Sequence, residues 1–443
     1  MGKNLLFCRR IFEAASSNNV EFVRAALEGS HGEQQQEDLE LALIRAATHG
    51  HVDCANLLLK HGVDVAAVDG QESTALIHAA ENGHLETVKL LLEHGCPINH
   101  QNSSGYTALM KVCENGHVDI LELLLQNGAT DMSDDVAVEH PGVPNGVPNG
   151  VKKLPRYMPH GHSCLMVTVL KQPENYKSIL RKLLASNLNV NAVDYQDMTV
   201  LHHAANTCPE DVITLLLDAK VNIDAKDVWG TSALMVAAAY GKTENVRQLL
   251  KYGADVGLCC KSKRTALTVA VRTGSEELIQ TLLDAGADPM ARDAHNHTPL
   301  FIAILHNNYA AVKCMIKAGS DLDVVCRVLT TFQMMSCFEC AVYKRQQEVV
   351  RMLYQAGACN NKMLYEQATS EQLKQQSTEF PDLVDELNRM ASKPRSLQQT
   401  CRMVIRHTIQ GQMKADSSYA VMVKKIELPK SLREYLLYSD INL

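Results

Sequence analysis

The chain has 443 residues, of which 46% are hydrophobic but only 5% aromatic. Its net charge of −7 argues against a general binder of nucleic acid or anionic membrane, and no apolar run approaches the roughly 18 residues of a membrane span. The fourteen cysteines are scattered along a long chain, so we expect reduced, intracellular thiols rather than a disulfide framework.

The chain begins with two imperfect copies of a pattern that becomes clear at residues 74–95. The first copy spans residues 11–29, and the second spans residues 41–62. The second has Leu41 where the clear copies have Thr. A polar run at residues 33–38 stands at the junction between the two copies and is expected to form a loop.

The clear copy predicts two short helices. Thr74 is expected to cap the first, because its hydroxyl can accept a hydrogen bond from a free backbone N–H. Gly83 ends that helix, and Gly95 ends the second, where a left-handed residue costs least. Four apolar residues of the second helix share one face: Leu85, Val88, Leu91 and Leu92. Helices this short cannot close a core alone, so each copy must stack on its neighbours.

The pattern returns with a period of 33 residues. Thr107 begins the next copy, and after an interruption four further copies begin at Thr199, Ser232, Thr265 and Thr298. This period and the Thr-x-Leu-x-x-Ala start resemble ankyrin repeats. With an altered fifth copy from Ser163 and a last copy from Ser336 to Gly357, the total is about ten repeats.

Several His and Cys residues imitate metal ligands. The Gly-His pairs recur once per repeat at one position, which predicts a turn role: His51, His84 and His117. Cys337 and Cys340 fall on ordinary packing positions of the last repeat. His160 and His162 have no Cys or carboxylate at ligand spacing, so we expect no zinc site there.

The chain also contains none of the motifs of common enzymes. A Gly-rich phosphate loop with Lys-Ser/Thr, a nucleophile elbow and a paired Cys-x-x-Cys ligand set are all absent from the sequence. We therefore expect a non-catalytic protein with no catalytic residues and no cofactor.

Composition divides the chain into segments. Residues 132–160 contain a tandem of Pro-Asn-Gly turn formers, which predicts a flexible inserted loop. The last 51 residues carry a net charge of +5 on an otherwise acidic chain. The expected segments are repeats one to four at residues 1–131, the loop at 132–160, repeats five to ten at 161–361, a helical linker at 362–392 and a basic tail at 393–443.

Turns between ankyrin-like repeats project as fingers, where recognition residues commonly lie. Those of repeats five to nine are rich in aromatic and basic residues: Tyr195, Trp229, Lys261, Lys263, Arg264, His295 and His297. Trp229, the only Trp, is either an interface anchor or a ring leaning on the next finger. Aromatic anchors beside basic residues suit a target segment that carries acidic residues. The candidate target-binding residues are Tyr195, Trp229, Lys261, Lys263 and Arg264.

The basic tail predicts a helix between Pro394 and Gly411. Leu397, Cys401 and Ile405 are four residues apart and form one apolar stripe. This stripe is either the core of the tail or an exposed face for a partner, and about 50 residues are too few to bury it well alone.

Ser396, together with that stripe, resembles the Elongin-binding segment of a SOCS box. A second segment, residues 428–436, resembles the cullin-selecting segment of the same box. Its matching residues are Leu428, Pro429, Leu432, Tyr435 and Leu436. It departs from the family pattern at Glu427, where a Pro is usual.

Ankyrin-like repeats followed by this tail resemble the ankyrin-repeat and SOCS-box family. The resemblance implies an all-α ankyrin solenoid with a C-terminal helical SOCS box. It further implies a cytoplasmic, or also nuclear, substrate receptor that docks Elongin B/C and cullin-5 with its RING protein. The repeats would capture an unidentified target protein for ubiquitination. The alternative is an ankyrin scaffold whose tail only caps the last repeat.

Overall fold

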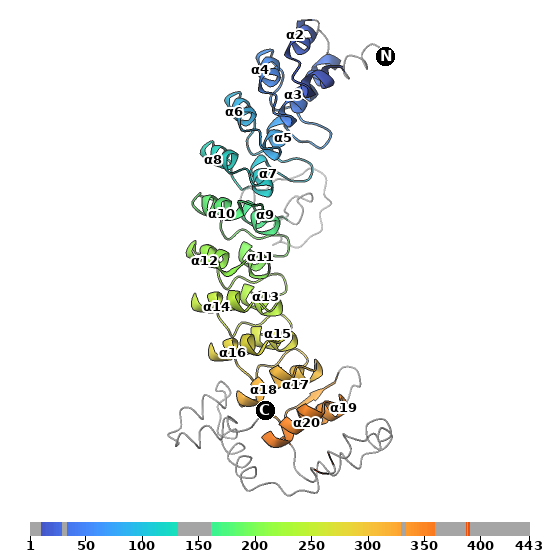
Figure 1. Ribbon diagram of the computed structural model, residues 1–443, viewed down its shortest axis with the longest axis vertical. Coiled ribbons are helices and arrows are strands. Elements are labelled where there is room, and N and C mark those ends of the chain that lie inside the picture. Colours follow the sequence, from blue (N-terminus) through green and yellow to red (C-terminus); the bar gives the residue numbers. More distant parts are fainter. Residues whose placement is uncertain are drawn as a thin grey trace, which may run out of the picture. The chain divides into compact units, whose positions relative to one another are not determined.

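The computed structural model describes residues 10–28, 33–131, 161–328 and 334–358, with 387 and 389. The chain forms two compact units, Met1–Val228 (the first unit) and Trp229–Leu443 (the second unit). In the described part of each unit, short helices follow one another in pairs (Figure 1). None of the described helices is both long and apolar enough to cross a membrane.

The first unit contains six helix pairs within its described residues. First helices of successive pairs pack against one another, and so do the second helices, which gives two layers. The pairs are residues 10–16 with α2 (Val20–Glu28), α3 (Glu33–Thr48) with α4 (Val52–Lys60), α5 (Ala75–Glu81) with α6 (Leu85–Glu93), α7 (Ala108–Asn115) with α8 (Val118–Gln126), α9 (Cys164–Lys171) with α10 (Tyr176–Leu184), and α11 (Val200–Thr207) with α12 (Glu210–Asp218).

The second unit contains four pairs of the same kind in its described residues: α13 (Ala233–Ala239) with α14 (Thr243–Lys251), α15 (Ala266–Thr273) with α16 (Glu276–Asp284), α17 (Pro299–Leu305) with α18 (Tyr309–Lys317), and α19 (Cys337–Tyr343) with α20 (Gln347–Ala356). The same two-layer stacking joins them. A small antiparallel pair, β1 (Val325–Arg327) and β2 (Met334–Ser336), precedes α19. The helical repeat fold is therefore confirmed, with a short antiparallel strand pair that the sequence did not reveal.

The local signals of the clear repeat act as predicted. The Thr74 hydroxyl accepts a hydrogen bond from the backbone N–H of Ile77 at 3.4 Å, which caps α5. Gly83 has φ +80°, and a Cβ there would come within 2.6 Å of the His117 ring. Val88 and Leu91 are fully buried. The flanking stripe residues remain half-buried: Leu85 and Leu92.

The Gly-His turns have the structural role that their spacing predicts. The imidazole Nε2 of His84 lies 3.0 Å from the Thr48 carbonyl oxygen, and that of His117 lies 3.1 Å from the Glu81 carbonyl oxygen. Each ring thus binds the end of a first helix in the preceding repeat. In the second unit, Asn308 does the same with an amide, donating to the Val271 carbonyl at 2.9 Å.

One predicted loop is wrong. Residues 33–38 belong to α3, a single helix of 16 residues. Gln and Glu are good helix formers, and Leu41 has no side-chain oxygen that could cap a helix starting beside it. The helix therefore begins about two turns earlier than in the other repeats.

Candidate target-binding surface

The fingers of both units are stiffened by the same backbone motif. In the first unit, Asp194 Oδ1 accepts hydrogen bonds from the N–H groups of Gln196 at 2.8 Å and Met198 at 2.9 Å. In the second unit, Asp293 Oδ1 accepts from His295 and His297, both at 2.9 Å. Such Asx turns fix the finger backbone, so the outward side chains are held on a rigid support.

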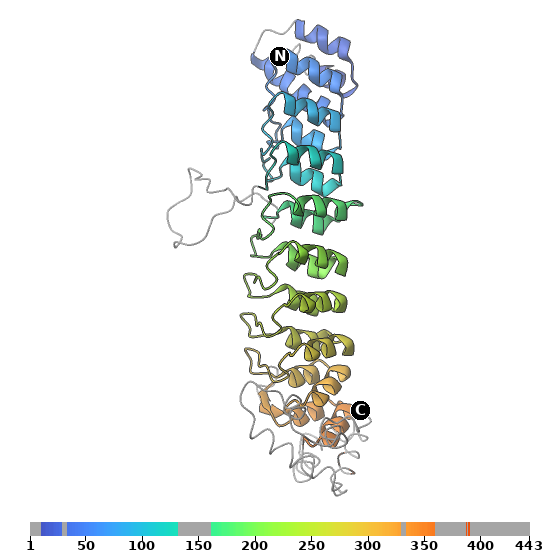
Figure 2. The ribbon, with the colours of Figure 1, turned by 90° about the vertical axis from the view of Figure 1, so that its left-hand side faces the viewer.

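In the second unit, neighbouring fingers are also joined by backbone hydrogen bonds. The N–H of Lys261 donates to the Trp229 carbonyl at 2.8 Å, and the N–H of Ala294 donates to the Ser262 carbonyl at 2.9 Å. Gly230, with φ +78°, approaches so closely that a Cβ would lie 3.2 Å from the Lys261 nitrogen. The fingers project from one side of the helices (Figure 2).

This joining brings four of the five predicted target-binding residues onto adjacent fingers. Trp229 is 53% exposed, Lys261 and Lys263 are exposed, and Arg264 is half-buried. We call Trp229, Lys261, Lys263 and Arg264 the finger surface. Because about half of Trp229 remains accessible to solvent, the residue is available to a partner.

Tyr195, the fifth predicted residue, belongs to the first unit. It is 40% exposed and lies against Gly161, where a Cβ would come within 3.3 Å of the phenol ring. Its cooperation with Trp229 stays a prediction.

His297 does not belong to the exposed finger residues among which the sequence grouped it. Only 4% of it is exposed, its ring centroid lies 5.2 Å from that of Phe301, and its Nε2 lies 2.7 Å from the Arg327 carbonyl oxygen. It immediately precedes the capping residue Thr298, a position that faces the next finger. His295, two residues earlier, is exposed.

A second group of charges, missed in the sequence, lies at the ends of first helices in the second unit. Arg272 is in the last turn of α15, His306 caps the end of α17 and Lys344 caps the end of α19. We call these three residues the basic edge. Burial lowers the pKa of His306, and the positive charges of Arg272, Lys344 and Arg264 lower it further. Arg264 of the finger surface therefore lies in the field of the basic edge.

Two aromatic residues lie at equivalent helix ends: Tyr240, after α13, is 62% exposed and Tyr343, the last residue of α19, is 42% exposed. The signal that could have found this group is the repeat register. Tyr240, His306 and Lys344 each lie eight residues after the capping Ser or Thr of their repeat.

The first helices of the first unit carry charges of both signs, at their ends and, for Lys111, within α7. Lys111 Nζ lies 2.9 Å from a Glu81 carboxylate oxygen and 3.3 Å from one of Glu114. Lys171 Nζ lies 2.7 Å from the other oxygen of Glu114. Burial would raise the pKa of Glu114, but its contacts with Lys171 and Lys111 outweigh this and lower the pKa.

The two cysteines of the last repeat pack in its core, as expected. Cys337 and Cys340 are fully buried and free. Burial raises the pKa of the Cys340 thiol to about 12 and that of Cys337 well above its ordinary value. Both thiols therefore stay protonated, whereas metal binding and disulfide exchange require thiolates.

The predicted Elongin-binding and cullin-binding residues lie outside the described residues. They are Ser396, Leu397, Cys401, Ile405, Leu428, Pro429, Leu432, Tyr435 and Leu436. Their assignment depends on sequence comparison alone.

Models of ankyrin repeats match residues 43–87, 67–135, 196–228, 220–293 and 295–324. The stacked helix pairs and their fingers thus define an ankyrin-repeat protein. A model of the SOCS box matches residues 393–437. The chain belongs to the ankyrin-repeat and SOCS-box family. Its parts are those of an adaptor that acts through protein–protein interaction.

Individual relatives match shorter stretches. Serine/threonine-protein kinase 12 of Arabidopsis thaliana is 36% identical over 75 residues, 17% of this chain and 16% of that protein. Ankyrin repeat domain-containing protein 29 of Danio rerio is 50% identical over 44 residues, 10% of this chain and 15% of that protein. The crystal structure of the ankyrin repeat domain of Bcl-3, an IkappaB family member, matches with a TM-score of 0.43 and 29% identity, over 53% of this chain and 95% of that one.

Proposed function

We propose that the chain is the substrate receptor of an Elongin B/C–cullin-5 ubiquitin ligase. The observation that carries this proposal is the match of a SOCS box to residues 393–437, after the ankyrin repeats. The receptor does no bond chemistry itself. By holding a target and the ligase together, it raises the effective concentration of target lysines near the conjugating enzyme. Such a receptor acts in the cytoplasm, and in the nucleus where its targets lie there.

Within the tail, the apolar stripe of Leu397, Cys401 and Ile405 would enter a groove of Elongin C. A helix with side chains at this spacing suits helix-in-groove recognition. Burying a leucine side chain in such a groove contributes about 1.5–3 kcal/mol. Pro429 and Leu432, in the segment after it, would contact cullin-5.

The target would bind on the second unit, through an acidic segment. Trp229 offers a half-exposed aromatic anchor of the kind that dominates binding energy. Lys261 and Lys263, with Arg264 behind them, can pair with carboxylates, and an Arg can do so through two parallel hydrogen bonds. The basic edge extends the same positive field. Because the whole chain is acidic, this surface selects a partner locally rather than by overall charge.

The test is a binding assay of the full chain with purified Elongin B/C, comparing wild type with Leu397→Ala/Cys401→Ala. We expect the double variant to lose Elongin binding, while circular dichroism and thermal melting of the repeats stay as in wild type. Binding that survives the double substitution contradicts the receptor function.

A second variant, Pro429→Ala/Leu432→Ala, separates the two tail segments. It should keep Elongin B/C but lose cullin-5, measured on the preassembled Elongin complex. A wild-type chain that binds no Elongin, and whose melting falls when Leu397 is replaced, would instead indicate the ankyrin scaffold with a structural cap.

A further inference from the structure

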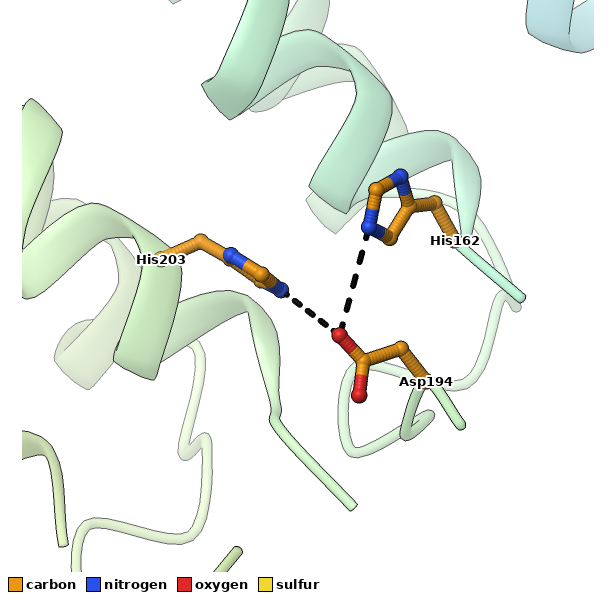
Figure 3. Close-up of side chains that lie close together, drawn as sticks. All are labelled: His162, Asp194 and His203. Carbon is orange, nitrogen blue, oxygen red and sulfur yellow. Dashed lines mark hydrogen bonds and ion pairs between the residues drawn. The ribbon is translucent and has the colours of Figure 1, made fainter. Parts of the chain in front are cut away.

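Three potential metal ligands converge in the first unit: His162, Asp194 and His203 (Figure 3). His162 precedes Ser163, the residue that caps α9, whereas Asp194 is in the next finger and His203 is in α11. The imidazole Nε2 of His203 lies 2.9 Å from Asp194 Oδ2, and that of His162 lies 3.9 Å from the same oxygen. The expectation that His162 lacks a carboxylate partner is therefore wrong, because the partner comes from the following repeat.

Part of this cluster is ordinary repeat structure. Asp69 and His78 form the same pair three repeats earlier, with His78 Nε2 lying 2.8 Å from Asp69 Oδ2. A bond between Asp and His therefore needs no metal to explain it. What distinguishes this cluster from the Asp69–His78 pair is its third member, His162. Among the described residues no second group of three such ligands occurs.

The position of His162 favours contact with the next finger. In the third repeat the same position, just before the capping residue, is Ser73, whose hydroxyl accepts a hydrogen bond at 3.1 Å from Asn102 of the following finger. A His at this position reaches further than a Ser and brings a ring nitrogen to the carboxylate. The centroids of the His162 and His203 rings lie 5.4 Å apart in an edge-to-face arrangement.

The Asp194 carboxylate, between the two rings, has one oxygen placed to bind a cation. Asp194 is only 3% exposed, and two backbone N–H groups occupy its Oδ1, so that Oδ2 faces the imidazoles. The side chains of His162 and His203 keep 17% and 13% exposure, which leaves access from solvent.

Two imidazoles and one carboxylate are ligands that suit Zn²⁺. Tetrahedral bonds of about 2.0–2.1 Å place neighbouring ligand atoms about 3.3 Å apart. The two observed nitrogen–oxygen distances, 2.9 and 3.9 Å, lie on either side of this value. All three ligand atoms lie within 4.8 Å of one another, so the side chains must draw together to bind one ion.

We propose that His162, Asp194 and His203 bind one Zn²⁺ ion, with water in the fourth position. The ion acts as a clamp, because it joins the start of α9 to the finger and first helix of the next repeat. An ion that binds only the folded chain stabilises that folded state. The clamp is independent of Elongin binding, which belongs to the tail.

The test is a zinc titration of the chelator-stripped full chain against a competing zinc indicator. Wild type is compared with His162→Ala, His203→Ala and His78→Ala. His203→Ala and His78→Ala each remove an Asp–His bond of the same kind, so both carry a similar cost to the fold. We expect His162→Ala and His203→Ala to weaken zinc binding by more than the roughly 10–100-fold typical of lost outer partners, while His78→Ala binds as wild type.

Melting with and without ZnCl₂ gives a second readout. Zinc should raise the melting temperature of wild type and His78→Ala, but not that of His162→Ala. His162→Gln, which keeps a polar side chain, should behave like His162→Ala. Equal zinc affinity in wild type and His162→Ala, or no stoichiometric binding by wild type, would overturn the proposal.

Discussion

The first helices use charge differently in the two units. In the first unit, Lys111 and Lys171 are paired with Glu81 and Glu114 in one network. In the second unit the ends of the first helices carry the basic edge, Arg272, His306 and Lys344. Within the part of the chain that the structure describes, none of these three has a carboxylate within ion-pair distance.

This difference separates a structural use of charge from a binding use. Partly exposed ion pairs contribute about 0–1 kcal/mol each, so the network of the first unit gives modest stability and leaves little net field. Among the described residues, Arg272 and Lys344 are unpaired exposed cations, which cost the fold little, and their field steers and selects an oppositely charged partner. The same repeat fold thus carries paired charges in the first unit and unpaired basic residues, which can bind a partner, in the described part of the second.

The largest loss of target binding is expected from reversing basic charges of the finger surface and the basic edge. In Lys261→Glu/Arg272→Glu/Lys344→Glu, three exposed cations become anions that repel an acidic target. At about 1 kcal/mol for each reversal, recovery of target proteins should fall roughly 100-fold. The measurement is affinity purification of the full chain followed by quantitative mass spectrometry, with Elongin recovery as the internal reference.

The matched control changes the net charge by the same amount in the first unit: Lys60→Glu/Lys89→Glu/Lys220→Glu. It should recover targets as wild type does. Equal losses in both triple variants would mean that net charge, rather than the second unit's surface, governs capture.

The next effect concerns the aromatic part of the finger surface. Trp229→Ala removes a half-exposed ring, and loss of an interface anchor of this kind costs about 2 kcal/mol, or roughly 30-fold in affinity. It should therefore weaken target capture more than replacing any single basic residue of the finger surface, and leave Elongin binding unchanged.

Tyr195→Ala in the first unit is the comparison variant for Trp229→Ala. If interaction proteomics returns the wild-type set of targets for Trp229→Ala but loses it for Tyr195→Ala, the binding site lies on the first unit. The finger surface would then be a structural contact only.

The repeats could be predicted from the sequence because each copy carries its own local signals, such as Thr74 at a helix start and Gly83 at its end. The prediction failed at residues 33–38. Leu41 cannot cap a helix start as Thr does in the other repeats, and good helix formers before it extend the helix. The prediction also failed for His162 and Asp194. These residues come from different repeats, and only stacking determines which side chains meet.

A smaller effect tests the structural use of charge in the first unit. Lys111→Met breaks contacts with Glu81 and Glu114 and should lower the stability of α7 by about 1 kcal/mol. Arg272→Met, the comparison variant on the basic edge, should leave the stability of α15 unchanged. Hydrogen exchange of peptides covering the two helices measures both variants in the full chain. An equal loss of protection in both would show that the two helices do not use their charges differently.

The smallest effect is a pH dependence of the same network. Because the pKa of folded Glu114 is lowered from its ordinary 4.5, its ionised form stabilises the folded state above that pH. This contribution, about 0.5 kcal/mol for a partly exposed pair, is lost as the pH falls through the lowered pKa. Wild type should therefore exceed Glu114→Gln in unfolding free energy at pH 7, and the two should converge as the pH falls below 4.5. Urea unfolding followed by far-UV circular dichroism at a series of pH values measures the difference. A constant difference across this range would assign the effect of the substitution to packing rather than to charge.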